Sequence, residues 1–470
     1  MRIYISLLIL TAFVLGAVLF VFNDQSSSQK EAVAQVQSYE LTNGMKIRVI
    51  ENHRAPVVVS QVWYNVGASF EHDGITGVSH VLEHMMFKGT PEYPSGKFSE
   101  IIAANGGKEN AFTSKDYTAY FQRIASDKLE ICLRMEADRM RNLILDEAEF
   151  LKEVEVVKEE RRLRTDDKPT GLLYERFNAM AYTNSPYRQP IIGWMEDLDS
   201  MTIDDLRSWY KSWYAPNNAT LVVVGDVDAD EVFKLAKEYF SPLAIVDLPV
   251  RKPRHEAEQY GVQRMSMQLP AEIPTLIMGY KVPVLITAKE PAEAYALEVL
   301  AGLLDGGDSA RLTRNLVRGE QLATSASAGY SLYARHEDLF TFSVIPSDGI
   351  GMDKLEAAIK KEIELIKETP PEQKEMDRVI AQVLASSVYE QDSSFYRAMQ
   401  IGILETLGLG WQTKEEYIEK VKAVTAEQVQ QVARKYLIDK HLSVAVLDPL
   451  PIEGKAVKAS SAQTGGRHAN

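Results

Sequence analysis

The chain has 470 residues, more than one domain usually holds, and its 45% hydrophobic and 25% charged residues are typical of a globular protein. The formal net charge of −14 argues against a nucleic-acid-binding surface, so we expect no nucleic-acid partner. The single cysteine, Cys132, excludes an intrachain disulfide and a thiolate zinc site. Any metal site in this chain must therefore use histidine and carboxylate ligands.

The N-terminal segment predicts export. Residues 3–22 carry no charge and form an apolar run long enough to cross a bilayer as a helix. Arg2 precedes this run, and the positive-inside rule then places the rest of the chain outside the cytoplasm. Either the segment remains as an anchor, or it is a signal peptide cleaved near Ala34. In both cases residues 1–37 form a signal or anchor with a polar linker, and we expect the protein on the periplasmic side of the inner membrane.

The following residues alternate between strand and helix patterns. Residues 38–48 predict a hairpin around Asn43-Gly44, and residues 56–66 form a mostly apolar run typical of a buried strand. Thr202 begins a capped helix that is followed by an apolar strand, and the same order recurs from Thr425 onward.

This recurrence indicates an internal duplication. The apolar run after Pro56 also resembles the run after Pro274, at nearly the same offset along the chain. We therefore predict two similar α/β halves, residues 38–248 and 259–450, joined by a charged linker at 249–258. The tail 451–470 is rich in small and polar residues and is predicted to be disordered.

The stretch 76–90, TGVSHVLEHMMFKGT, contains the sequence His80-Val-Leu-Glu83-His84. On a helix the two histidines lie one above the other on one face, with Glu83 beside them. Such a pair can hold one metal ion while the carboxylate reaches a bound water, as in the inverted H-x-x-E-H peptidase motif. The neighbours are apolar almost all round, and burying these groups unpartnered would cost several kcal/mol. A metal ion would satisfy them; a metal-free polar cluster is the alternative.

A second helical stretch places two carboxylates on one face. At about 100° per residue, Glu153 and Glu160 fall only about 20° apart, and Val156 and Val157 flank them. The opposite, solvated side carries Lys152, Glu155, Glu159 and Arg162. We therefore expect both glutamates to point inward.

A catalytic zinc site uses three protein ligands and a water, so two histidines leave one ligand missing. One of the two glutamates can supply it, and the other can orient a ligand from behind. The alternative is an ordinary pair of glutamates bound to Arg161 or Arg164.

Residues 109–121 predict a strand, a turn and a second strand. Beside a catalytic helix, such a hairpin is suited to binding an extended peptide by adding a strand. A purely structural hairpin is the alternative.

These motifs together resemble the pitrilysin/insulinase family of zinc peptidases, and most of all its shorter members related to the mitochondrial processing peptidase. The resemblance covers about residues 38–450 and rests on five motifs in order: GVSHVLEHMMFKGT (77–90), NAFTSKDYTAYF (110–121), EVEVVKEERR (153–162), SPYRQPIIG (185–193) and YAPNNATLVVVGDV (214–227). It implies an α+β fold in which two homologous α/β halves, each a mostly antiparallel sheet packed with helices, close as a clamshell around a chamber. With the N-terminal hydrophobic helix, this is the architecture we expect.

The resemblance also implies a role for individual residues. The family's metal and base positions fall on four side chains: His80, His84 and Glu160 as ligands of one Zn²⁺, and Glu83 as general base. Glu153 matches a carboxylate that supports the site, and Asn110 and Ala111 match the strand that pairs with substrate. The implied reaction is endopeptidase cleavage of peptides or unfolded segments of exported proteins. The residue types alone would also suit manganese or cobalt.

The chain departs from the family at an Arg/Tyr pair in the second half that binds the substrate carbonyl. Val317 and Thr324 stand at the expected positions, with Arg318 one residue off and Tyr330 the nearest candidate tyrosine. The pair is therefore displaced or comes from another chain. We expect a homodimer or a heterodimer, the latter with a subunit that lacks HxxEH and supplies the pair. A non-catalytic, membrane-anchored subunit is the competing class.

Overall fold

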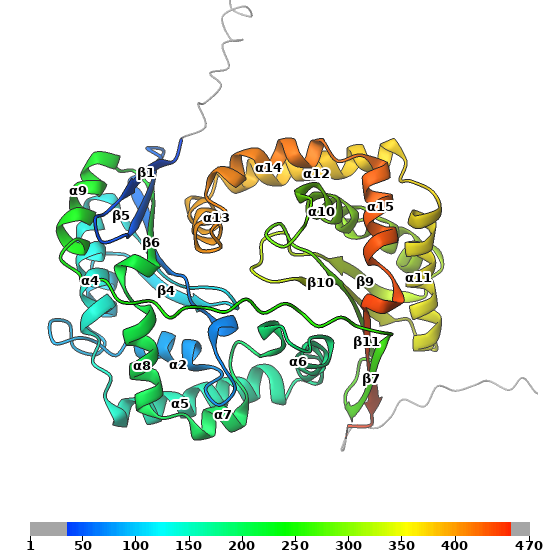
Figure 1. The fold of residues 1–470 in the computed structure, drawn as a ribbon, viewed down its shortest axis with the longest axis horizontal. Coiled ribbons are helices and arrows are strands. Elements are labelled where there is room, and N and C mark those ends of the chain that lie inside the picture. The colour runs from blue at the N-terminus through cyan, green and yellow to red at the C-terminus, as the bar shows by residue number, and fades with distance from the viewer. Residues whose placement is uncertain (1–34, 453–470) are drawn as a thin grey trace, which may run out of the picture.

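The computed structural model describes residues 35–452 and contains two mixed β-sheets, one in each half of the chain (Figure 1). The first sheet has the order β1-β2-β6-β3-β5-β4. Its strands are β1 (Gln37–Glu40), β2 (Lys46–Glu51), β3 (Val57–Tyr64), β4 (Lys108–Thr113), β5 (Thr118–Ala125) and β6 (Ala219–Gly225). All neighbours are antiparallel except β2 and β6.

The second sheet repeats this arrangement without a counterpart of β1. Its order is β7-β11-β8-β10-β9, and β7 and β11 form the parallel pair. The strands are β7 (Gln263–Pro270), β8 (Thr275–Val282), β9 (Ala323–Gly329), β10 (Asp338–Pro346) and β11 (Leu442–Leu450). The common order confirms the predicted pair of similar α/β halves, whereas the domain boundaries and the clamshell closure stay predictions.

Helices pack around both sheets. Those before the linker are α2 (Val78–Met85), α3 (Lys97–Ala104), α4 (Leu129–Asn142), α5 (Glu147–Arg161), α6 (Pro169–Ala181), α7 (Met195–Ser200), α8 (Ile203–Trp213) and α9 (Ala229–Phe240). Those after it are α10 (Pro291–Asp305), α11 (Met352–Glu368), α12 (Gln373–Gln391), α13 (Ser394–Thr406), α14 (Gln412–Lys422) and α15 (Ala426–Tyr436). The helices predicted from the histidine motif and from the capping signals are all present.

Local sequence signals account for several boundaries. Gly44 adopts a left-handed φ of 83° in the turn between β1 and β2, a conformation that glycine reaches without strain. Thr202 and Thr425 each form a complete capping box at the first turns of α8 and α15, as their sequences predict.

Each half contributes one helix to the sheet of the other half. Helix α6, although it precedes the linker, packs across the second sheet, where Leu173 and Phe177 join Ile277 and Ala445 in one buried cluster. Helix α13 does the reverse. It covers the first sheet through a cluster that includes Ile401. This exchange buries the second face of each sheet.

The contact of α13 with the first sheet is so close that only glycine fits at one position. A Cβ atom added to Gly402 would lie 2.0 Å from Cε2 of Trp63, which is fully buried on β3. Beside this contact, Glu405 of α13 accepts two hydrogen bonds of 3.0 Å from Arg48 of β2. Apolar and charged contacts therefore hold α13 at a fixed position on the sheet.

The linker 249–258 is extended and is held to both halves. Glu256 accepts hydrogen bonds from the backbone N–H groups of Thr183, Asn184 and Ser185, and from Lys281 Nζ of β8. In Figure 1 this segment is the long green coil that crosses between the two halves.

Among residues 35–452 no helix is both long and apolar enough to cross a bilayer. The predicted hydrophobic helix at 3–22, the predicted cleavage near Ala34 and nearly all of the predicted disordered tail 451–470 lie outside the described residues.

We expect Gly402→Ala to destabilise the protein by about 1–3 kcal/mol or more, because the new methyl group cannot share space with the Trp63 ring. Urea unfolding followed by circular dichroism measures this change. Gly261→Ala is the control, since a Cβ atom there meets nothing within 4 Å. Equal stability of the two variants would contradict this packing.

Candidate metal centre

The two motif histidines lie on one face of α2, which packs between α5, α8 and β4. His80 and His84 have ring centroids 4.9 Å apart in an edge-to-face arrangement. The i and i+4 spacing predicted from the sequence therefore brings both imidazoles to the same place.

A close backbone contact fixes the start of α2. Gly77 has a left-handed φ of 89°, and a Cβ atom added to it would lie 2.6 Å from the Ile192 carbonyl oxygen. A Cβ atom on Gly193 would in turn lie 2.3 Å from the Thr76 carbonyl oxygen. This contact explains why the segments 76–78 and 185–193 both carry glycine where they meet.

Two carboxylates complete the N-terminus of α2. Glu71 accepts hydrogen bonds from the backbone N–H groups of Gly77 (2.7 Å) and Ser79 (2.9 Å), which the helix itself leaves unpaired. Asp197 accepts from the N–H and hydroxyl groups of Thr76. Burial raises the pKa of Glu71 to about 7, although these N–H donors act to lower it. Sequence inspection alone missed both carboxylates, since they lie outside the histidine motif.

Helix α5 brings Glu160 to the two histidines. Its Oε2 atom lies 3.7 Å from His80 Nε2 and 3.5 Å from His84 Nε2, and one ligand atom from each residue lies within 4.8 Å of the others. Zn–N distances of about 2.0–2.1 Å imply tetrahedral edges of about 3.3 Å, so Glu160 lies at a suitable distance from both imidazoles for one small cation. The donor set of two imidazoles and a carboxylate also fits zinc.

His80 is present in the form that binds metals. Burial and the nearby His84 lower the pKa of His80 to about 3, so its ring is neutral at pH 7. A neutral imidazole offers a lone pair to a metal ion. Its Nδ1 atom is buried and has no hydrogen-bond partner within the described chain.

Glu153 lies behind the histidines, as predicted. Its Oε2 atom lies 3.1 Å from His84 Nδ1, and its Oε1 atom lies 2.5 Å from Lys88 Nζ. Burial acts to raise the pKa of Glu153, but the hydrogen bonds from Lys88 and His84 outweigh it and lower that pKa. The carboxylate is therefore placed to orient His84 through the ring atom that faces away from Glu160. Lys88 was not anticipated from the sequence.

The two arginines considered as alternative partners behave differently. Arg164 lies 2.6 Å from Glu160 Oε1, so Glu160 has both an arginine partner and an oxygen facing the histidines. Arg161 instead pairs with Glu175 of α6 at 2.7 Å and donates to the Gly193 carbonyl oxygen at 2.8 Å. The prediction that two valines flank the glutamates on the buried face is confirmed for Val157 and wrong for Val156. Val157 is buried, but the side chain of Val156 is 48% exposed.

Glu83 points toward β4. It accepts a hydrogen bond of 2.6 Å from the Thr113 hydroxyl at the end of that strand. Burial raises the pKa of Glu83 above its usual value. The carboxylate therefore lies between the histidine pair on its own helix and the strand beside it, a link that the sequence did not reveal.

The predicted substrate residues lie on β4, the outermost strand of the first sheet. Asn110 and Ala111 pair on one side with β5 residues Phe121 and Tyr120, and no other strand of residues 35–452 pairs with β4. Such an edge carries free backbone groups that can pair with an added strand.

The residues considered for the Arg/Tyr pair already have partners in the second half. Arg318 ends a short π-helical segment, has a 60% exposed side chain and lies 2.8 Å from Asp308. The Tyr330 hydroxyl donates to the Pro283 carbonyl oxygen at 2.8 Å. Thr324 is exposed on β9.

Comparison with known proteins places the chain in a family. Residues 46–194 match the model of insulinase (peptidase family M16), and residues 200–383 match that of the peptidase M16 inactive domain. The zinc protease PqqE of Helicobacter pylori is 32% identical over 387 residues, which span 81% of this chain and 85% of that protein. The chain belongs to peptidase family M16. The uncharacterized zinc protease YmxG of Bacillus subtilis is a further M16 relative, 27% identical over 88% of this chain and 98% of its own.

Solved structures agree with the M16 assignment. The crystal structure of a protease from Helicobacter pylori matches with a TM-score of 0.83 and 31% identity, covering 88% of this chain and all of that one. The periplasmic protease PqqL from Escherichia coli shares the fold, with a TM-score of 0.76 and 20% identity over 88% of this chain and 47% of that one. The names of the relatives support a protease of family M16 that uses zinc.

The raised pKa of Glu71 predicts a specific pH dependence. Between pH 4.5 and about 7 the folded protein binds more protons at this site than the unfolded chain, so the contribution of Glu71 to stability falls as pH rises. Each unit of pKa difference corresponds to about 1.4 kcal/mol.

We therefore expect the stability of the wild type relative to Glu71→Gln to fall between pH 5 and pH 8, measured as the difference in free energy of unfolding in urea. Glu100→Gln, at an exposed position that pairs with Lys97, is the control and should show no such trend. A pH-independent difference for Glu71→Gln would contradict the assignment.

Proposed function

We propose that this chain is a zinc-dependent endopeptidase in which His80, His84 and Glu160 hold one Zn²⁺. The observation that carries the proposal is the convergence of these three ligand atoms within 4.8 Å on two packed helices. The zinc protease names of the relatives point to the same metal. The bound ion would polarise a scissile carbonyl and lower the pKa of a water molecule.

Glu83 is the general base of this proposal. It lies next to the histidines and is largely removed from water, and burial raises its pKa, which makes its carboxylate a better proton acceptor. It would take the proton of the attacking water and pass it to the leaving amine. The Thr113 hydroxyl donates to one carboxylate oxygen of Glu83, and in this proposal the other oxygen accepts the proton.

The substrate class follows from β4. A peptide that adds to this edge must be extended, so we propose peptides and unfolded segments as substrates, with Asn110 and Ala111 pairing with their backbone. That these belong to exported proteins, on the periplasmic side of the inner membrane, is a proposal that rests on the uncharged run 3–22 alone.

A partner-dependent enzyme is the second candidate. One observation favours it: Arg318 pairs with Asp308, and the Tyr330 hydroxyl is bound to a carbonyl oxygen, so both groups have local partners. A second subunit that lacks HxxEH would then supply the Arg/Tyr pair, and this chain would supply the metal. A membrane-anchored subunit that has no activity of its own is a variant of this second candidate.

The decisive variant is Glu83→Gln. We expect the full chain to hold close to one zinc ion and to cleave a quenched-peptide library, and Glu83→Gln to keep the metal but lose activity by about 100-fold or more, because the proton acceptor is gone. Elemental analysis and fluorescence measure the two quantities.

Glu160→Gln should lower metal content, whereas Glu159→Gln, exposed and paired with Arg162 on the outer side of α5, should change neither quantity. Metal bound by the purified chain without any cleavage would favour the partner-dependent enzyme. Cleavage that survives Glu83→Gln would exclude the proposed mechanism.

A further inference from the structure

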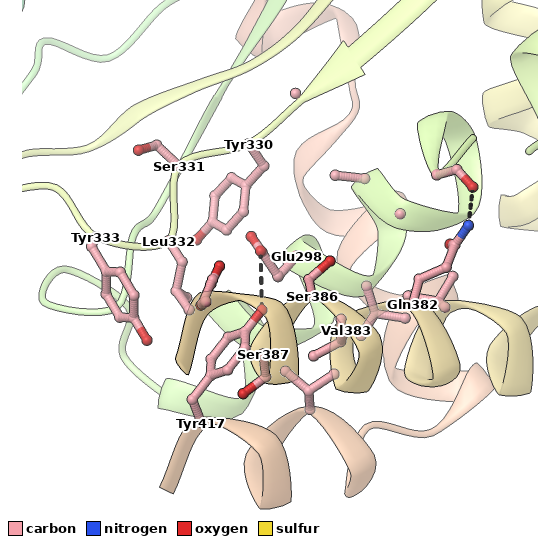
Figure 2. Close-up of a pocket in the computed structure, with 18 of the residues that line it drawn as sticks. Glu298, Tyr330, Ser331, Leu332, Tyr333, Gln382, Val383, Ser386, Ser387 and Tyr417 are labelled. Atoms are coloured by element: carbon pink, nitrogen blue, oxygen red, sulfur yellow. Dashed lines mark hydrogen bonds between the residues drawn. The ribbon is translucent and has the colours of Figure 1, made fainter. Parts of the chain in front are cut away.

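The second half contains a cavity of about 820 Å³ between α10, α12, α13, α14 and the segment that joins β9 to β10 (Figure 2). Its place in the duplicated fold corresponds to the metal centre. Helix α10 follows β8 as α2 follows β3, and the next two strands of each half form the outer hairpin of the sheet.

The strand ends allow residues of the two helices to be compared. Tyr64 pairs with Thr118 at the end of β3, and Val282 pairs with Asp338 at the end of β8, so these two strand ends are equivalent. Counted without gaps from these ends, Glu298 stands where His80 stands in the first half, although His80 lies near the start of α2 and Glu298 in the middle of α10. The second half therefore has a carboxylate on the helix that corresponds to α2, and this carboxylate lines a hollow.

The charge of Glu298 is not compensated. Its one hydrogen bond within the described chain comes from the Tyr417 hydroxyl at 3.4 Å, and it forms no ion pair there. Burial raises the pKa of Glu298 to about 7. Lys414 is the basic residue of the cavity wall, and it lies 2.9 Å from Glu390, so it already has a carboxylate partner.

Tyrosines surround this carboxylate. Figure 2 shows Tyr330 and Tyr417 on either side of Glu298, with Tyr333 farther along the same wall beyond Leu332. The Tyr333 hydroxyl is buried and has no hydrogen-bond partner within residues 35–452. Aromatic faces and a carboxylate together form a favourable environment for an organic cation, through cation–π and charge attraction.

The cavity also has a link to the substrate strand. Tyr117, at the turn between β4 and β5, forms part of its wall. The cavity therefore adjoins the turn at the end of the strand that we propose binds substrate.

We propose that this cavity is a specificity pocket that binds a positively charged group of the peptide substrate, an ammonium or guanidinium, against Glu298 and the surrounding tyrosines. The proposal rests on the proposed peptidase function for the identity of its ligand. Because it concerns binding, it is testable without hydrolysis.

The experiment uses the full chain with Glu83→Gln, titrated calorimetrically with matched peptides. The two peptides of the first pair have an acetylated N-terminus and differ at one internal position, which is lysine or norleucine. The two peptides of the second pair lack lysine and differ at the N-terminus, which is free or acetylated. Binding that depends on lysine assigns the pocket to a side chain, and binding that depends on the free terminus assigns it to the amino terminus.

We expect a further Glu298→Gln substitution to weaken binding of the cationic peptide by about tenfold or more, since a charge-assisted contact is lost. Binding of the matched neutral peptide should not change. Tyr333→Leu, which removes an aromatic face, should weaken the same peptide. Glu364→Gln, exposed and paired with Lys367 on α11, is the control. Equal affinity for cationic and neutral peptides, including no binding of either, would overturn the pocket. If the wild-type chain fails to hydrolyse peptides while the Glu83→Gln chain still binds the cationic peptide more tightly than the neutral one, the catalytic proposal alone is overturned.

Discussion

The buried side chain of Arg161 connects the segments that position the candidate metal ligands. It follows Glu160 directly on α5, pairs with Glu175 of α6, and donates to the carbonyl oxygen of Gly193, whose backbone touches the start of α2. One guanidinium thus joins the helix that carries the carboxylate ligand, the loop that supports the histidine helix, and the helix that packs on the second sheet. These contacts tie together the segments that surround the candidate ligand atoms.

Such a buried ion pair contributes more to specificity than to stability. Its charges lose their hydration on folding, and the pairing approximately offsets that cost, whereas removing one partner costs about 3–5 kcal/mol. The exchange of α6 and α13 between the two sheets provides the apolar stabilisation instead. The buried charged contacts of Arg161 thus lie beside the candidate site, whereas the apolar contacts of α6 and α13 lie across the sheets.

The duplicated architecture explains how the two halves differ in chemistry while sharing a fold. In both halves a helix follows the central strand and precedes the outer hairpin of the sheet. In the first half this helix carries two imidazoles that meet a carboxylate, and in the second half it lines a hollow that includes Glu298. Catalytic chemistry and ligand selection can thus occupy equivalent positions of one repeated scaffold.

The sequence by itself determined everything that depends on neighbours along the chain. The turn at Gly44, the capping boxes, the alternation of strand and helix, and the inward direction of Glu153 and Glu160 follow from periodicity and local hydrogen bonding, and the structure has them. The histidine motif brings both imidazoles together, because its i and i+4 spacing fixes geometry within a single helix turn.

The tertiary structure alone decided which distant groups meet. That α6 covers the second sheet, that Lys88 contacts Glu153 and that Thr113 contacts Glu83 all depend on segments brought together from far along the chain. That Val156 faces solvent was likewise decided by what packs on α5. Periodicity says which face of a helix is apolar or charged, but it does not say what packs against that face. That partner depends on how the whole chain packs, and here it determines the surroundings of every residue of the site.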